Sequence, residues 1–173
     1  MLILLLVSFT GNIKSQSSII ERSGDLLFVG LPVLAFGVTF LENSNFEGSR
    51  QAMLSIGTAG MATNFLKRVI NDPRPNGERF GFPSGHSAMA FTGAAFIQHR
   101  YGWAYGIPAY LLASYVGFTR IYANKHDLWD VMGGAAIGII SVNCFTTRYK
   151  DTKIKLNITG NGQSNLLNLS MVF

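Results

Sequence analysis

Two histidines occupy positions whose neighbours favour chemistry over packing. His86 follows Ser84 and Gly85 in the segment PSGH, at the start of an apolar run, and His126 precedes Asp130 by four positions. On a helix, residues four positions apart lie on one face, one turn from each other. The carboxylate of Asp130 can then accept a hydrogen bond from Nδ1–H of His126 and leave Nε2 as a nucleophile. An ordinary ion pair on a helix surface has the same spacing.

Three basic residues accompany these histidines: Lys67, Arg74 and Arg120. Fixed cations suit a phosphate better than a carboxylate, because a phosphate offers three oxygens and the planar fork of arginine binds two of them at once. The peptide N–H groups around Ser84 and Gly85 precede the start of a helix, where an anion is stabilised. Glycine at position 85 lets the backbone come close to a ligand. The residues together predict a phosphate-binding site.

The remaining reactive side chains receive a plainer interpretation. His99 belongs to a polar turn on the opposite side of the expected bundle, and we assign it no chemistry. Cys144 is the single cysteine, which excludes an intrachain disulfide and a cysteine-based metal site. The net charge is +5, but the basic residues form no single stripe. That distribution favours an anionic substrate or lipid headgroups and argues against a nucleic-acid partner.

The composition indicates a membrane protein. Apolar residues make up 48% of the chain and charged residues only 13%, against roughly a quarter charged in ordinary soluble domains. The mean hydropathy of +0.26 is positive but modest. A small soluble periplasmic protein with buried helices is therefore the alternative.

Apolar runs and breaking residues predict five main helices. We expect them over residues 26–41, 52–66, 86–98, 101–118 and 126–145, with residues 17–25 as a polar lead-in. Gly134 and Gly138 have the GxxxG spacing that lets helices approach closely in lipid. In an antiparallel bundle the second and fourth helices end where the third and fifth begin, so the phosphate-binding residues converge on one face. The expected fold is all-α, an antiparallel membrane-embedded bundle of about five to six helices.

The two ends of the chain differ from this core. Residues 1–16 begin with the apolar segment MLILLLVSF, which is typical of a signal peptide or a short anchor. Residues 17–150 form the expected helical catalytic domain. In residues 151–173, apolar residues alternate on both sides of Asn161-Gly162, which predicts a C-terminal β-hairpin.

Three segments taken in order carry a family resemblance. They are KRVINDPRP at 67–75, PSGH at 83–86 and TRIYANKHDLWD at 119–130. This series resembles the signature of the type 2 phosphatidic acid phosphatase (PAP2) family, which is related to bacterial class A acid phosphatases and vanadium haloperoxidases. With the helices that carry the segments, the resemblance covers about residues 26–146. One departure is Thr119, where the family usually has serine; the hydroxyl is kept.

The resemblance implies a role for each matching residue. His126 would be the nucleophile that forms a phosphohistidine, Asp130 would orient it, and His86 would be the general acid. The implied phosphate-binding residues are Lys67, Arg74, Ser84, Gly85 and Arg120. The resemblance implies neither a metal nor another cofactor, because fixed cations neutralise the phosphate.

The function expected from these observations is metal-independent hydrolysis of a lipid phosphate monoester or pyrophosphate. Candidate substrates are phosphatidic acid, phosphatidylglycerophosphate, undecaprenyl pyrophosphate and the phosphates of lipid A. We expect a bacterial-type cell membrane as the location, with the active site facing the periplasm or the exterior. The alternatives are a soluble periplasmic acid phosphatase of broad specificity, a vanadate-dependent haloperoxidase, and a membrane protein that binds anionic headgroups without catalysis.

Overall fold

The chain is a helical bundle built around one central helix. The computed structural model describes residues 2–41, 46–149, 154–160 and 165–171. The elements are α1 (Leu2–Val38), η1 (Thr39–Leu41), α2 (Glu47–Ile70), α3 (Gly85–Tyr101), α4 (Trp103–Tyr122) and α5 (Leu128–Phe145), followed by β1 (Ile154–Gly160) and β2 (Asn165–Met171). Helix α3 packs against the other four α-helices. The bundle confirms the predicted all-α architecture.

Small residues on α3 explain its central place. Ala88, Ala90, Ala94 and Ala95 are buried, so neighbouring backbones approach this helix closely. The predicted GxxxG contact is confirmed on α5. A Cβ at Gly138 would lie 2.6 Å from the carbonyl oxygen of Ala88, and a Cβ at Gly134 would lie 2.4 Å from that of Ser84. Neither glycine can therefore be replaced by a larger residue without moving α5 away from α3.

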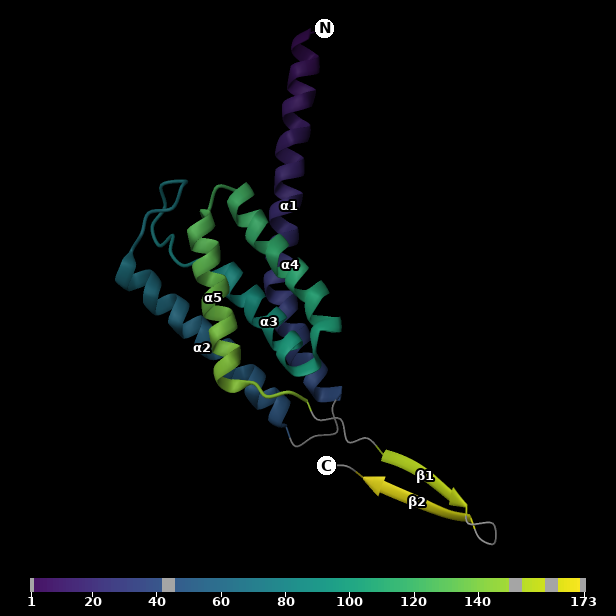
Figure 1. Cartoon of the computed structure of the whole chain (residues 1–173). Coiled ribbons are helices and arrows are strands. Elements are labelled where there is room, and N and C mark those ends of the chain that lie inside the picture. The colour runs from purple at the N-terminus through teal and green to yellow at the C-terminus, as the bar shows by residue number, and fades with distance from the viewer. Residues whose placement is uncertain (1, 42–45, 150–153, 161–164, 172–173) are drawn as a thin grey trace.

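The loops that matter for the site lie at one end of the bundle. The connection between α2 and α3, residues 71–84, and the turn between α4 and α5, residues 123–127, meet at the upper end in Figure 1. The short junction between α3 and α4 lies at the other end. This arrangement matches the antiparallel order that the sequence predicted.

The first helix corrects one prediction. Residues 17–25 were expected to be a polar lead-in, but α1 runs without a break from Leu2 to Val38, and its N-terminal part extends past the bundle (Figure 1). The polar stretch stays helical because tertiary contacts hold it: Lys125 pairs with Glu21, and Arg120 pairs with Asp25. The predicted boundary at residue 16 falls inside this helix. The assignment of residues 1–16 to a signal peptide or anchor stays a prediction.

Other helix ends also differ from the prediction by a few residues. Helix α2 begins five residues earlier than expected and continues past Lys67 to Ile70, and α4 continues past Phe118 to Tyr122. At the C-terminus, β1 and β2 pair antiparallel, with Ile158 opposite Leu167. The expected turn at 161–162 lies outside the described residues, so the hairpin as a whole stays a prediction.

Candidate active site

His126 and Asp130 form a buried pair at the start of α5. Nδ1 of His126 lies 3.0 Å from Oδ2 of Asp130, and the two side chains are 4% and 2% exposed. Burial at this depth distinguishes the pair from a solvated surface ion pair. With Nδ1 bonded to the carboxylate, Nε2 is the nitrogen left for substrate.

The structure corrects the reason why this pair forms. His126 was expected on the helix, but α5 begins at Leu128 and Asp127 is its N-cap. The carboxylate of Asp127 accepts from the Asp130 N–H at 2.8 Å, and Oδ2 of Asp130 accepts from the Asp127 N–H at 3.2 Å. The same Oδ2 atom also faces His126. A reciprocal cap, rather than helical periodicity, therefore brings the ring and the carboxylate together.

Ser84 and Gly85 join the start of α3 to the His126–Asp130 pair. Ser84 is fully buried, and its N–H donates to the carbonyl oxygen of Asp130 at 2.9 Å. Its hydroxyl caps α3 by accepting from the N–H and the hydroxyl of Ser87. Because the N–H of Ser84 is already bonded, it is not available to an anion. The N–H groups that can bind the expected anion are those of Gly85 and His86.

Close helix packing makes this junction possible. A Cβ at Gly134 of α5 would lie 2.4 Å from the carbonyl oxygen of Ser84. Any side chain at position 134 would push α5 away from the start of α3 and separate Asp130 from Ser84.

His86 lies on the first turn of α3 and contacts α1. Its Nε2 is 3.1 Å from Oδ1 of Asp25, and the ring centroids of His86 and Phe28 are 4.0 Å apart. About a third of the His86 side chain is exposed, so a substrate can reach it.

Arg120 is held by the same helix. Its guanidinium is 1% exposed and donates through Nη1 to Asp25 at 2.8 Å and through Nη2 to the Glu21 carbonyl oxygen at 2.9 Å. Nε donates to the hydroxyl of Thr119 at 3.2 Å. Thr119 stands where serine is usual in the family that the sequence resembles, and its hydroxyl accepts this bond from Arg120.

Lys67 and Arg74 complete the basic side of the site. Nζ of Lys67 donates to the carbonyl oxygen of Phe80 at 2.8 Å, and its Cε would be 3.8 Å from a Cβ at Gly85. Arg74 pairs with Glu78 through Nη1. Its Nε is buried and finds no hydrogen-bond partner among the described residues. An anion in the site would supply that partner.

The electrostatics of the site favour a neutral ring on His126. Burial lowers the pKa of His126, the hydrogen bond that the ring donates to Asp130 opposes this shift, and the charges of Lys67 and Arg74 lower the pKa further. Burial, followed by the charge of Arg120, also lowers the pKa of His86 to about 4, and Asp25 opposes the decrease. Both rings stand at the polar end of the bundle, outside the apolar runs of the helices.

The structure therefore brings all eight predicted residues to one end of the bundle. It also places three acidic residues nearby that sequence reasoning missed: Asp25 and Asp127, whose carboxylates contact site residues, and Glu21, whose carboxylate pairs with Lys125 outside the site. Asp127 could have been found from the capping-box pattern Asp127-x-x-Asp130 ahead of an apolar run. Glu21 and Asp25 carry no local signal, because their partners lie about a hundred positions away in α4 and in the turn that follows it.

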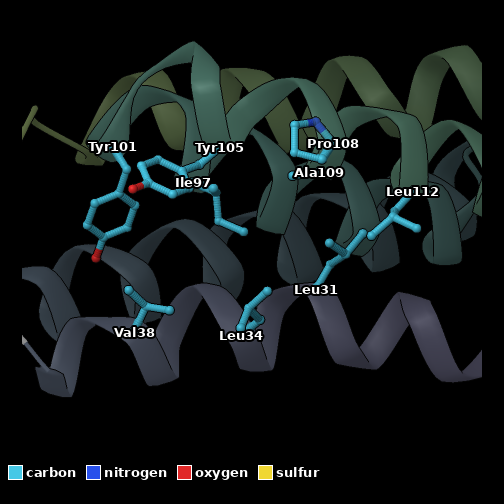
Figure 2. A pocket seen from close by; sticks show the side chains of 9 residues that line it. All are labelled: Leu31, Leu34, Val38, Ile97, Tyr101, Tyr105, Pro108, Ala109 and Leu112. Carbon is cyan, nitrogen blue, oxygen red and sulfur yellow. The ribbon is translucent and has the colours of Figure 1, made fainter.

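Two apolar grooves flank α1 below the polar end. One, of about 510 Å³, lies between α1 and α2 and is lined by residues that include Phe28, Phe36, Ile56, Gly57 and Met89. The other, of about 520 Å³, lies between α1 and α4. Figure 2 shows its lining, with Leu31, Leu34 and Val38 facing Tyr105, Pro108 and Leu112. The first groove reaches the site, because Phe28 also contacts His86.

Comparisons with known proteins agree with this geometry. Residues 76–154 match the model of the PAP2 superfamily. The lipid A 4'-phosphatase of Helicobacter pylori strain J99 is 35% identical over 151 residues, which cover 80% of this chain and 75% of that protein. This chain belongs to the PAP2 superfamily. The resemblance read from the three segments is confirmed, and so is the prediction of a PAP2-type phosphatase.

Further relatives of this PAP2 chain support the same conclusion. A lipid A 1-phosphatase of Helicobacter pylori strain 26695 is 30% identical over 111 residues, which cover 57% of this chain and 58% of that protein. The crystal structure of Aquifex aeolicus LpxE superposes with a TM-score of 0.60 at 29% identity, and covers 76% of this chain and 84% of that one. A transmembrane PAP2-type phosphatidylglycerolphosphate phosphatase from Bacillus subtilis, at 23% identity and a TM-score of 0.55, shares the fold.

Proposed function

We propose that this PAP2 phosphatase hydrolyses a phosphate monoester or pyrophosphate of a membrane lipid through a phosphohistidine on His126. The observation that carries the proposal is the buried His126–Asp130 pair, which stands close enough to His86, Lys67 and Arg74 for their charges to act on one another. Lipid A phosphates are the first substrates to test, because the two Helicobacter pylori relatives described above are lipid A phosphatases. Phosphatidylglycerophosphate and phosphatidic acid come next.

The reaction proceeds in two displacements. Nε2 of His126 attacks phosphorus while the bond to the leaving oxygen breaks, and His86 gives a proton to that oxygen. Lys67 and Arg74 neutralise the charge on the phosphoryl oxygens. Water then attacks the phosphohistidine, His86 takes a proton from the water, and inorganic phosphate leaves with His126 restored. The depressed pKa of His126 keeps its ring neutral, as a nucleophile requires.

The outer surface of the bundle supports a lipid environment. Many large apolar side chains are exposed on several helices, among them Leu26, Val33, Met61, Phe65, Leu111 and Trp129. Apolar patches of this extent on a soluble protein would drive association. Within the described residues, α5 (Leu128–Phe145) is the one helix that is long and apolar enough to cross a membrane by itself. We place the apolar middle of the bundle in the bilayer and the polar end at its surface.

The apolar groove between α1 and α2, which Phe28 lines, can bind an acyl chain of the lipid. His86 must reach the oxygen that links phosphate to lipid, so the leaving lipid lies on the His86 side of the phosphate. Phe28 contacts His86 and lines the apolar groove between α1 and α2. An acyl chain in this groove stays in apolar surroundings while its headgroup occupies the polar end.

A phosphate-release screen over a panel of lipids in detergent tests the proposed chemistry. His126→Ala is the blank, and His99→Ala is the matched control, because the third histidine lies at the opposite end of the bundle. We expect His126→Ala to lose several orders of magnitude in turnover and His99→Ala to behave as the wild type. Equal rates in His126→Ala and the wild type would remove the nucleophile assignment.

Two further measurements test the membrane placement. We expect the protein to stay with membranes during an alkaline carbonate wash, and full release would favour the soluble alternative. For orientation, Arg79→Cys in a Cys144→Ser background puts one thiol in the loop beside the site. An impermeant maleimide should label this thiol in intact cells, and labelling only after lysis would place the catalytic end in the cytoplasm.

A further inference from the structure

Asp25 contacts two proposed catalytic groups although it belongs to none of the three segments. Its Oδ1 accepts from Nη1 of Arg120 at 2.8 Å and lies 3.1 Å from Nε2 of His86. One carboxylate oxygen thereby connects α1, α3 and α4. Asp25 also lies outside residues 76–154, which match the family model.

The backbone of α1 is shaped to bring Asp25 to this place. Gly24 is buried, and a Cβ there would lie 2.1 Å from the hydroxyl oxygen of Thr119 and 2.9 Å from Nη2 of Arg120. The carbonyl oxygen of Glu21, one turn earlier, accepts from the same Nη2 at 2.9 Å. Helix α1 is therefore packed directly against the arginine, so Asp25 stands on a fixed element.

We propose that Asp25 is a positioning residue of the hydrolysis, one that orients the ring of His86 and holds Arg120 beside it. The proposal rests on the proposed function of this site. In this proposal each histidine has one ring nitrogen held by an aspartate and the other free for the reaction. Asp130 binds Nδ1 of His126 and leaves Nε2 for phosphorus, whereas Asp25 binds Nε2 of His86 and leaves Nδ1 for the leaving oxygen.

The proton balance of the step is simple. As the bond between phosphorus and the leaving oxygen breaks, its electron pair stays on that oxygen, which takes the proton from Nδ1 of His86. Asp25 remains ionised throughout, and the neutral ring later accepts a proton from the attacking water. Three groups face His86: Asp25 from α1, Arg120 from α4 and His126 ahead of α5. Of these, only Asp25 favours the protonated ring, so its removal makes the acid form rarer.

The test compares Asp25→Asn with the wild type on two substrates that differ in the leaving group. An alkyl phosphate lipid needs a proton on its leaving oxygen, and 2,4-dinitrophenyl phosphate does not. We expect kcat for the lipid to fall by about 10- to 100-fold in Asp25→Asn, a part of the roughly 10²- to 10⁴-fold that general acid catalysis contributes. The rate with dinitrophenyl phosphate should change far less, and the alkaline limb of kcat for the lipid should move to lower pH. Asp25→Glu keeps a carboxylate and should recover much of the loss.

Glu21→Gln is the matched control. It removes one negative charge from the same helix, its side chain pairs with Lys125, and its backbone carbonyl is unchanged. We expect its alkaline limb to coincide with that of the wild type. Melting curves in detergent show whether each variant is folded. If Asp25→Asn does not fold, Asp25→Ser, which also lacks the carboxylate, takes its place in the same comparison.

Three results would overturn the proposal. Equal losses on both substrates would mean that Asp25 does not act through the acid. A faster Asp25→Asn enzyme would mean that the carboxylate competes with the phosphate. An unmoved alkaline limb would remove the link to His86. In each case a dead His126→Ala variant leaves the proposed function standing, whereas an active one removes that function itself.

Discussion

The capping box of α5 offers a substitution that separates catalysis from folding. Oδ2 of Asp130 faces His126 Nδ1 at 3.0 Å and also accepts from the Asp127 N–H at 3.2 Å. Asp130→Asn keeps the size of the side chain and one oxygen that can still accept from the backbone. It removes the negative charge that favours Nδ1–H on His126. The imidazole can then adopt the other tautomer, with the proton on the attacking nitrogen.

The expected effect on rate is large, because the pair is buried and nothing else described contacts Nδ1. When an asparagine replaces the aspartate that orients a catalytic histidine, the loss in kcat reaches about 10⁴-fold in the best-known triad. We expect a loss of about 10²- to 10⁴-fold for Asp130→Asn. The effect on stability is smaller, on the order of 1 kcal/mol, because the cap keeps most of its hydrogen bonds.

Asp127→Ala is the matched control, since Asp127 shares the capping box but its side chain bonds only the Asp130 N–H among the contacts described. Losing an N-cap carboxylate costs about 0.5–2 kcal/mol of stability. We expect Asp127→Ala to lower the unfolding temperature while kcat falls less than tenfold. Phosphate release from a lipid substrate and thermal unfolding in the same detergent measure both quantities.

Two outcomes would refute this reasoning. If Asp127→Ala lost as much kcat as Asp130→Asn, the carboxylate contact to the ring would have no special role. If Asp130→Asn kept a rate within threefold of the wild type, His126 would not depend on an oriented tautomer.

Three further predictions concern the groove, the helix packing and the pH profile. Gly57→Leu fills open space in the groove beside Phe28. Excluding about three methylenes at roughly 0.8 kcal/mol each should lower kcat/KM for long-chain lipids by about 50-fold. Gly138→Ala places a Cβ 2.6 Å from the Ala88 carbonyl oxygen and should destabilise the fold by about 1–3 kcal/mol in thermal unfolding. Because the pKa of His86 is lowered to about 4 and a bound phosphate dianion favours its protonated form, the alkaline limb of kcat should lie at higher pH than that of kcat/KM.

The first two of these predictions have a control variant in the same chain, and the third has an outcome that would contradict it. Gly30→Leu adds the same side chain to open space on α1 outside both grooves, and an equal loss there would remove the groove assignment. Gly37→Ala meets nothing within 4 Å, and destabilisation as large as in Gly138→Ala would show a general effect of replacing glycine. Coincident alkaline limbs for kcat and kcat/KM would contradict the assignment of His86 as the acid.

Local sequence patterns predicted most of the residues of the candidate site. The spacing of the three segments selected His86, His126 and the basic residues, since residue type and order are properties of the chain alone. The helices were predictable from apolar runs broken by proline and glycine. Their alternating direction then put the selected residues at one end. The cap at Asp127 was within reach of the same reasoning.

Other features depended on contacts between distant parts of the chain. Residues 17–25 look too polar for a buried helix, and tertiary partners such as Lys125, Arg120 and Tyr115 explain why α1 continues through them. The pairing of Ser84 N–H with the Asp130 carbonyl likewise depends on how closely α5 approaches α3 at Gly134.

Asp25 is the clearest example of a residue whose role follows from the tertiary structure and not from the sequence. In the sequence it is an acidic residue ahead of an apolar run, a position that carries no functional signal. Its partner Arg120 is 95 positions away, and the two meet because Gly24 lets α1 lie directly against α4. The sequence by itself determined which residue types, and in which order, are available for the proposed binding of and attack on a phosphate. The tertiary structure decided which nitrogen of each histidine is held, because that depends on carboxylates placed by helix packing.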